Sequence, residues 1–360
     1  MRRTLLVIGL GATIALSAEA QASTINQNTS WTIDRAGTTT KYRAVGYGDS
    51  IFAGYRGSIF NVAKRAATLV NGEYASNAWG TDLEVIRRTK SGAVASDIYN
   101  NKIVAERSYM QNTTTRIVAF EMCGNDYLQA RSNFNGQSGT CNYSQRDTAL
   151  ANCTNYMGLG MQAINQYATT ATVKMIANLY YPGYNADNGL SNCTDPTTGQ
   201  RVNKQDNFLP VLARSNWRAC HLAETNGFAC ADSFAQYMGA DYDSNGDGQI
   251  DSDALRYVSG ESEDAYVTRI SVTLRATIRD ANTHFVNSST SFDYIQSDDT
   301  HPTYSGSATI GINIFTGSGS GSGAPDYSGG QIVGGKNPVW NQFGHERMGW
   351  ALSVFDPATP

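Results

Sequence analysis

The chain has 360 residues, of which 41% are hydrophobic and 16% are charged, a composition typical of a folded globular protein rather than a disordered one. Its 27 basic and 31 acidic residues give a net charge of −4, and beyond the N-terminal segment no cluster of Lys and Arg is longer than a pair. Nucleic acid is therefore not expected as a partner, because binding it requires a basic surface.

The first 22 residues have the pattern of a secretory signal peptide. Basic residues at positions 2 and 3 precede an apolar run over 5–16, and small residues then offer cleavage after Ala20 or Ala22. The alternative is an N-terminal membrane anchor, but the run is shorter than the roughly 20 apolar residues of a spanning helix. We predict a secreted or periplasmic protein whose mature chain has an N-terminal segment over 23–40 and no integral membrane segment.

Strands and helices are predicted to alternate through the main domain, residues 41–315. Short stretches rich in β-branched and aromatic residues predict strands at Lys41–Tyr47, Leu83–Ile86, Arg116–Glu121 and Val173–Tyr181. Helical patterns lie between and after them at Ser58–Glu73, Asp147–Tyr167 and Asp264–Phe285. This alternation predicts an α/β fold in which a parallel sheet is covered by crossover helices.

Two segments depart from this pattern. Residues 182–260 are rich in Asn, Gly and Cys, and we predict that they form a long insertion held by disulfides. Residues 316–360 begin with a Gly/Ser loop. The tail that follows contains enough aromatic residues to pack back onto the domain.

Six cysteines form an even set in a chain that is predicted to be exported, and disulfides are therefore expected. A metal site is the competing interpretation, but no C-x-x-C pair supports it. Six cysteines allow 15 connectivities, and the sequence does not choose among them. They are Cys123, Cys141, Cys153, Cys193, Cys220 and Cys230.

Gly48-Asp49-Ser50 follows the first predicted strand and offers a candidate nucleophile. Small residues before the serine allow a sharp turn that exposes its hydroxyl at the carboxyl edge of the sheet. Phe52 stands where the nucleophile elbow of α/β-hydrolases has its second glycine, so this is a different motif. A nucleophilic serine also needs a base, an acid that orients the base, and donors for the oxyanion.

Three later segments supply candidates for these partners. Residues 88–93 contain Gly92, residues 120–126 contain Asn125, and Ser297-Asp298-Asp299-Thr300-His301-Pro302 contains an acid and a histidine. Together and in this order, the four segments resemble the four blocks of the SGNH (GDSL-type) serine hydrolase family. The resemblance extends from Gly46 to Pro302.

The resemblance implies a flavodoxin-like three-layer α/β/α sandwich with a central parallel sheet. It assigns Ser50 as nucleophile, His301 as base and Asp298 as the acid that orients the base; the neighbouring Asp299 stands at the wrong offset. It places the oxyanion on the N–H groups of Ser50 and Gly92 and on the amide of Asn125. At position 123 a cysteine replaces the glycine of the family motif, and a disulfide is expected to hold the backbone there.

A second motif resembles the calcium-binding loop of EF-hand proteins. Its candidate oxygen ligands suit a hard cation and are Asp243, Asn245, Asp247, Gln249 and Asp251. Ala254 occupies the position of the usual bidentate glutamate, and an acidic surface turn is the alternative. Any Ca²⁺ here is expected to be structural, and no cofactor is expected for catalysis.

The predicted function is that of a secreted serine esterase or lipase that hydrolyses carboxylic esters through a Ser-His-Asp triad and a covalent acyl-enzyme. Its substrate would be an acyl ester, whether a lipid, a short-chain ester or an acylated glycan. Two alternatives stay open at this point. One is an acyltransferase that uses the same site, and the other is a non-catalytic, calcium-stabilised surface-binding protein.

Overall fold

The computed structural model describes residues 28–33, 38–53, 76, 79–239, 254–278, 284–286, 290–292 and 300–301. Several predicted features lie outside the described residues: the signal peptide, the helix at 58–73, the calcium-type loop at 243–251, Asp298, and the segment 316–360.

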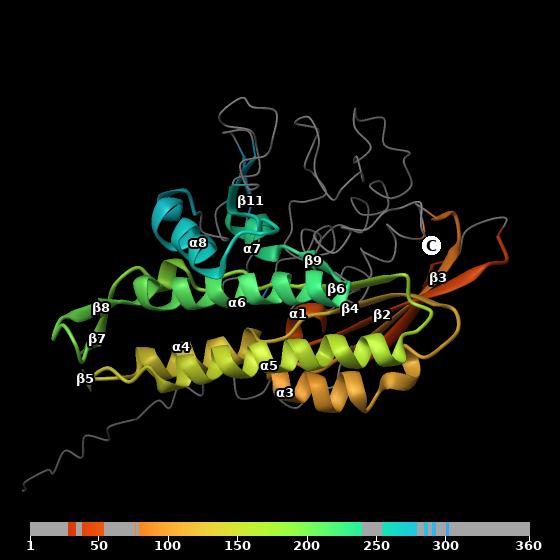
Figure 1. The fold of residues 1–360 in the computed structure, drawn as a ribbon, viewed down its shortest axis with the longest axis horizontal. Helices are drawn as coiled ribbons and strands as arrows, with labels where there is room; N and C mark the ends of the chain where they lie inside the picture. The colour runs from red at the N-terminus through yellow and green to blue at the C-terminus, as the bar shows by residue number, and fades with distance from the viewer. Residues whose placement is uncertain are drawn as a thin grey trace, which may run out of the picture.

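A six-stranded sheet forms the centre of the molecule (Figure 1). Its strands lie in the order β1-β3-β2-β4-β6-β9. Strand β1 is antiparallel to β3, and every other neighbouring pair is parallel. The strands are β1 (Thr29–Ile33), β2 (Lys41–Gly48), β3 (Asp82–Thr89), β4 (Thr115–Phe120), β6 (Val173–Ala177) and β9 (Ala229–Ala231).

The predicted α/β fold class with a central, mostly parallel sheet is confirmed. In chain order, the five parallel strands lie as second, first, third, fourth and fifth, which is the order of flavodoxin-like α/β/α sandwiches. The strand order reverses at β2, whose neighbours are β3 and β4. In open α/β sheets, ligands bind where the order reverses, beyond the carboxyl ends of the strands.

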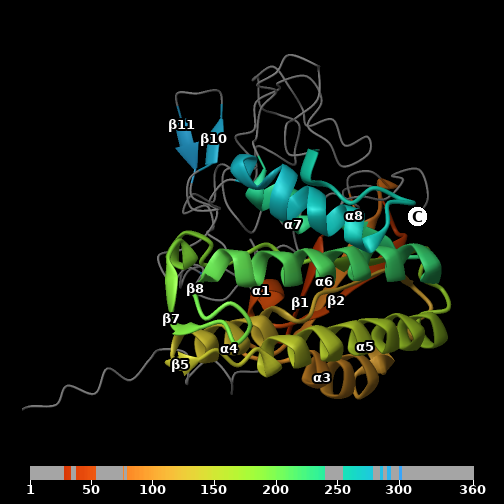
Figure 2. The same ribbon diagram turned by 60° about the vertical axis from the view of Figure 1, so that its left-hand side comes forward.

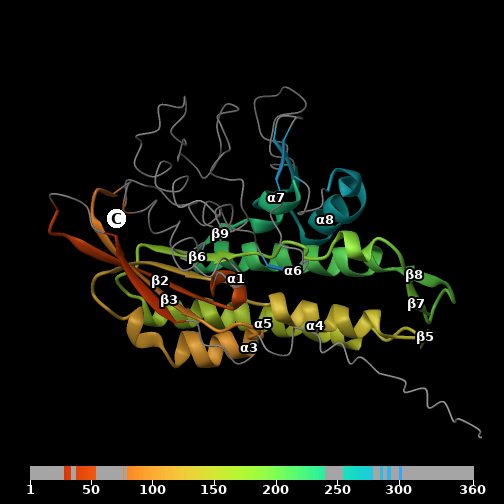
Figure 3. The same ribbon diagram turned by 180° about the vertical axis from the view of Figure 1, so that it is seen from behind.

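Helices cover one face of the sheet. Figure 2 shows α3, α5 and α6 side by side in front of the strands, and Figure 3 shows the strands from behind. Buried residues of α5 recur three or four positions apart, so a single apolar stripe of this helix faces the core. The helices are α3 (Ala95–Asp97), which continues as the π-helix η3 (Ile98–Val104), α4 (Gly124–Asn135), α5 (Ser144–Tyr167) and α6 (Lys204–Asn226).

Shorter elements complete the described residues. They are α1 (Ser50–Ala53), η4 (Arg107–Tyr109), β5 (Gly139–Thr140), η5 (Asn185–Asp187), β7 (Leu190–Thr194), β8 (Arg201–Asn203), α7 (Ser233–Met238), α8 (Glu263–Thr268), η7 (Arg269–Thr273), η8 (Arg275–Thr277), β10 (His284–Val286) and β11 (Thr290–Phe292).

The prediction that residues 182–260 form an insertion is wrong for much of their length. They include α6, which packs against α5 and the sheet, and β9, which is the last strand of the sheet. The Asn203 side chain caps the start of α6 by accepting the N–H of Asp206, and Gly227 ends the helix with φ +73°. Pro210 lies within the first turns of α6 and does not break it.

The prediction of a single long helix over 264–285 is also wrong. Helix α8 ends at Thr268, gives way to the π-helix η7 and the 3₁₀-helix η8, and Phe285 lies in strand β10. β-Branched residues crowd this region, including Ile270, Val272 and Thr273, and they lower helix propensity because their χ1 rotation is restricted.

Two disulfides are present, Cys141–Cys193 and Cys220–Cys230. The expectation of disulfides is therefore confirmed for four of the six cysteines, while Cys123 and Cys153 are buried free thiols. The expected disulfide at the cysteine that replaces the motif glycine is absent, although the Cys123 thiol interacts with that of Cys153. Among the described residues, no helix combines the length and apolar character that crossing a membrane requires.

We predict that a thiol reagent finds no reactive cysteine in the native protein and two per chain after unfolding without reductant. Burial protects both thiols, and it raises the pKa of the Cys123 thiol well above its ordinary value, which disfavours the reactive thiolate. A Cys153→Ser variant should give one thiol per chain. A count of zero in the unfolded wild type would mean that Cys123 and Cys153 form a third disulfide.

Candidate active site

Ser50 lies directly beyond the carboxyl end of β2, at the first position of the short helix α1. Its Oγ is 3.0 Å from Nε2 of His301, although 251 positions separate the two residues in the chain. Both residues are largely buried, with 4% and 8% of their surfaces exposed. A serine hydroxyl within hydrogen-bond distance of an imidazole is the arrangement that activates a serine nucleophile.

Two tyrosines hold the segment that carries His301. The hydroxyl of Tyr180, beyond the end of β6, donates to the carbonyl oxygen of Thr300 at 2.6 Å. The Tyr180 ring stacks on that of Tyr237 in α7, with centroids 4.4 Å apart and planes 10° apart. The position of the imidazole therefore depends on β6 and α7 as well as on its own segment.

Gly92 lies in the turn after β3, beside the end of β2. It adopts φ +75°, a left-handed conformation in which a Cβ is unfavourable. The N–H of Lys90 donates to the carbonyl oxygen of Gly48 at 3.0 Å, which fastens this turn to the nucleophile turn. Within the described part of the chain, neither the N–H of Ser50 nor that of Gly92 donates to an acceptor. Among the described residues, these two N–H groups are the candidate backbone donors to an oxyanion at this sheet edge.

Asn125 lies in the first turn of α4, which follows β4. Its amide nitrogen donates to Oδ2 of Asp49 at 2.9 Å and to the carbonyl oxygen of Ala93 at 3.0 Å. Both amide hydrogens are therefore in use, and an oxyanion would have to replace one of these acceptors. The amide joins the Gly92 turn to the nucleophile turn, so the three turns form one hydrogen-bonded unit.

Asp126 adds a second link between the turns. Its Oδ2 accepts the N–H of Ala95 at 2.8 Å, which connects α4 to the start of α3. Burial raises the pKa of the Asp126 carboxyl to about 6, although the hydrogen bond from Ala95 opposes the shift.

Asp49 and Glu121 form a buried carboxyl pair behind the nucleophile. The N–H of Asp49 donates to Oε1 of Glu121 at 2.6 Å, and the two side chains are also hydrogen-bonded to each other. Oδ1 of Asp49 accepts the N–H of Ile51 at 2.8 Å, which fixes the turn around Ser50. A Cβ on Gly48 would overlap Oε1 of Glu121, so this close approach requires glycine at position 48.

Burial of both carboxyl groups raises both pKa values, and it favours a state in which one of the two groups keeps its proton. Burial raises the pKa of the Glu121 carboxyl well above its ordinary value of 4.5, and the negative charge of Asp49 raises it further. Burial also raises the pKa of Asp49, while hydrogen bonds from Ile51, Glu121 and Asn125 oppose that shift. We assign the proton to Glu121, which then donates to the Asp49 carboxylate.

The structure brings together four of the five residues predicted for the triad and the oxyanion hole, Ser50, Gly92, Asn125 and His301. Ser50 and His301 are in contact, Asn125 is hydrogen-bonded to the residue before Ser50, and the Gly92 turn is fastened to Gly48. Asp298 and the five candidate calcium ligands lie outside the described residues, so their roles stay predictions. The sequence reasoning missed Glu121, whose signal was an acidic residue at the end of an apolar strand.

An apolar pocket opens beside the nucleophile. Ser50, Asn125 and Thr300 are among the polar residues that line it. Apolar side chains supply much of the remaining lining, including Ile51, Leu179 and Leu212. A pocket of this kind suits the apolar part of a small-molecule ligand.

No known family model and no curated protein sequence matches this chain. Solved structures of lipases and esterases are similar to it. A lipase from a goat rumen metagenome has 15% identity and a TM-score of 0.41, and the match covers 67% of this chain and 99% of the lipase.

A phospholipase A1 from Streptomyces albidoflavus has 17% identity and a TM-score of 0.40, with 67% and 100% of the two chains covered. An acetylxylan esterase from Geobacillus stearothermophilus has 13% identity and a TM-score of 0.36, with 56% and 80% covered.

We predict that Glu121→Gln becomes progressively more stable than the wild type as the pH rises above about 4.5. Below that pH, Glu121 is protonated in both the folded and the unfolded chain. Above it, the unfolded chain releases the proton while the folded protein keeps it, so the wild type loses stability with rising pH. Glutamine cannot titrate, and its amide can both accept from the N–H of Asp49 and donate to the Asp49 carboxylate.

Urea unfolding at a series of pH values between 4 and 8 measures this difference. Glu224→Gln, at an exposed position, controls for the loss of one carboxylate. Parallel stability curves for wild type and Glu121→Gln across this range would show that Glu121 is ionised in the folded protein.

Proposed function

We propose that this protein is a secreted serine esterase or lipase of the SGNH type, with Ser50 as nucleophile and His301 as base. One observation carries the proposal: Oγ of Ser50 lies 3.0 Å from Nε2 of His301, at the sheet edge where the strand order reverses. The turns that carry Gly92 and Asn125 meet at the same edge, where an oxyanion hole would be required.

In the proposed reaction, the Ser50 hydroxyl attacks the ester carbonyl while His301 takes its proton. The N–H groups of Ser50 and Gly92 stabilise the oxyanion. The amide of Asn125 joins them by exchanging one of its present acceptors, Asp49 or Ala93, for the oxyanion. His301 then returns the proton to the departing alcohol. Water then attacks the acyl-enzyme with His301 again as base, which releases the acid and regenerates Ser50. We propose Asp298 as the acid that orients His301.

Export is part of the proposal. The signal-peptide pattern at residues 1–22 motivates it, and two disulfides support it, because disulfides persist in oxidising compartments. The calcium-type loop stays a proposal for a structural Ca²⁺ site, with no part in the reaction.

We predict that a fluorophosphonate probe labels the wild type and that Ser50→Ala abolishes both labelling and ester hydrolysis. The probe reacts only with a serine whose hydroxyl is activated by a base. Ser132→Ala, at an exposed position on α4, is the matched control and should keep full labelling. Circular dichroism of each variant checks the fold.

Labelling that persists in Ser50→Ala would reject Ser50 as the nucleophile. A wild type that is folded but never labelled would favour the non-catalytic surface-binding alternative. Ester formation with an added alcohol in place of hydrolysis would identify an acyltransferase that uses the same site.

We also predict that Asn125→Ala lowers kcat by about 10²–10³ with little change in KM, because the loss of one oxyanion donor acts on the transition state and not on substrate binding. Asn133→Ala, an exposed position further along α4, should leave kcat unchanged. The readout is steady-state kinetics on a soluble ester, with unfolding curves for both variants. A near wild-type kcat for Asn125→Ala would show that Asn125 has only a structural role, through its hydrogen bonds to Asp49 and Ala93.

A further inference from the structure

One side chain of α6 fixes the chain directly after β6. Asn216 of α6 is buried; its Oδ1 accepts the N–H of Leu179 at 2.9 Å, and its Nδ2 donates to the carbonyl oxygen of Leu179 at 2.7 Å. Both backbone polar groups of Leu179 are thereby paired with a helix that packs on the sheet. The next residue is Tyr180, so its Cα has a fixed place relative to β6 and α6.

Helix α7 is fixed to the same end of β6. Asn178, the first residue after this strand, is buried; its Oδ1 accepts the N–H of Phe234 at 3.0 Å, and its Nδ2 donates to Oδ1 of Asp232 at 2.9 Å. Asp232 is also the N-cap of α7, so the start of the helix is tied to β6. Tyr237 lies in this helix and is fully buried, and its ring is the one that stacks on Tyr180. Both partners of the stack therefore belong to fixed segments.

The Tyr180 side chain extends from these anchors to the segment of the base. Its hydroxyl donates to the carbonyl oxygen of Thr300 at 2.6 Å, and the residue is only 5% exposed. This carbonyl belongs to the planar peptide unit that joins Thr300 to His301. The hydrogen bond therefore fixes the plane from which His301 begins, and only the torsions of His301 itself lie between this plane and the imidazole.

We infer that Tyr180 is a positioning residue for the general base of the proposed esterase. Its hydroxyl holds the peptide unit before His301, and this unit places Nε2 of His301 3.0 Å from Oγ of Ser50. The inference rests on the proposed function, because a base is needed only if Ser50 is a nucleophile. Tyr180 acts through the backbone, since the acceptor of its hydroxyl proton is a protein carbonyl and not a substrate atom.

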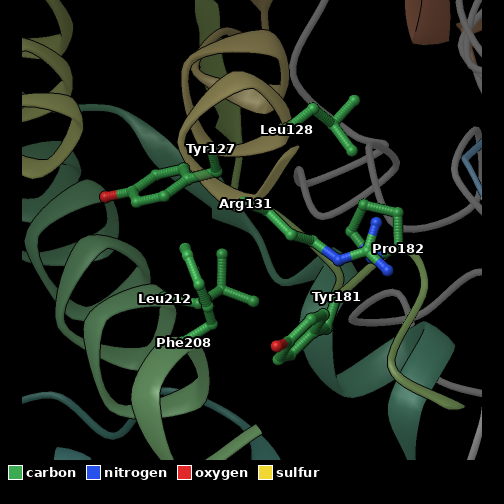
Figure 4. A pocket seen from close by; sticks show the side chains of 7 residues that line it. All are labelled: Tyr127, Leu128, Arg131, Tyr181, Pro182, Phe208 and Leu212. Atoms are coloured by element: carbon green, nitrogen blue, oxygen red, sulfur yellow. The ribbon is translucent and has the colours of Figure 1, made fainter. Parts of the chain in front are cut away.

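Tyr181 provides a matched control for Tyr180. It is buried as well, and its hydroxyl also donates one hydrogen bond, to Oδ2 of Asp187 at 2.9 Å. Figure 4 shows the Tyr181 ring near Arg131 of α4, which donates to the same oxygen of Asp187. Loss of the Tyr181 hydroxyl therefore removes a buried hydrogen bond of the same kind, but at a contact with α4 and η5 and not at the segment of the base.

Steady-state kinetics of Tyr180→Phe and Tyr181→Phe on a soluble ester test the inference. Phenylalanine keeps the ring and its stack, so Tyr180→Phe removes only the hydrogen bond to Thr300. We expect kcat to fall by about 10- to 100-fold with little change in KM, since displacing a catalytic group by about 1 Å can cost about 10²-fold in rate. Tyr181→Phe should keep the wild-type kcat, while urea unfolding shows a comparable loss of stability in both variants.

Three results of these kinetics would overturn the inference. A wild-type kcat in Tyr180→Phe would show that the hydroxyl does not position the base. Equal losses of kcat in the two variants would show that the tyrosine hydroxyls act through stability alone. A change confined to KM in Tyr180→Phe would show that Tyr180 acts as a wall of the pocket beside Ser50, which it also lines.

A double-mutant cycle tests whether Tyr180 acts through His301. A His301→Ala protein lacks the base and should retain only slow residual hydrolysis. Adding Tyr180→Phe should lower this residual rate no further, because a residue that acts by placing the imidazole has no effect once the imidazole is gone. A further loss as large as that in the wild-type background would mean that Tyr180 acts independently of His301, contrary to the inference.

Histidine NMR tests the positioning role without turnover and separates it from the proposed function. The chain has four histidines, and the His301→Ala variant identifies the ring signals of His301. These signals should shift in Tyr180→Phe and stay unchanged in Tyr181→Phe. Unchanged His301 signals in Tyr180→Phe would overturn the positioning role even if the wild type hydrolyses esters. Shifted signals in a protein whose wild type hydrolyses no ester would show that Tyr180 positions His301 and would reject the esterase.

Discussion

The N–H of Asp49 donates to the carboxyl group of Glu121, and at this contact the turn after β2 meets the turn after β4. Asp49 in turn accepts from Ile51 and Asn125, so one buried carboxylate fixes both the nucleophile turn and the start of α4. A buried carboxyl pair is costly unless one member keeps its proton and the other is fully hydrogen-bonded. This hydrogen-bonded pair therefore holds the candidate site rigid. Its cost to the stability of the folded protein rises with pH.

Helix α4 joins the candidate site to the pocket beside it. Its first turn carries Asn125, and the residues that follow, Tyr127 and Leu128, line the pocket that opens beside Ser50. Because these residues share one helix, the distance from Asn125 to this wall of the pocket is fixed by helical geometry.

Much of this architecture could be predicted from the sequence, and the exceptions have physical causes. Strands β2, β3 and β4 are predictable because their β-branched and aromatic residues favour a pleated, buried backbone. Helix α6 is hard to predict because it contains Pro210 and many polar residues, although Asn203 and Gly227 are local signals of its two ends. The pairing of cysteines and the role of Glu121 depend on contacts between distant segments, which local patterns do not encode.

Gly48 restricts which residues can occupy position 121. The absence of a side chain at position 48 is what lets the Glu121 carboxyl reach the backbone of Asp49. A mutation of Gly48 to alanine would displace Glu121 and destabilise the protein. This loss of stability would largely disappear if position 121 held a smaller residue. The two positions are therefore epistatic: in homologous chains, we expect the identity of one to restrict the identity of the other, although 73 positions separate them.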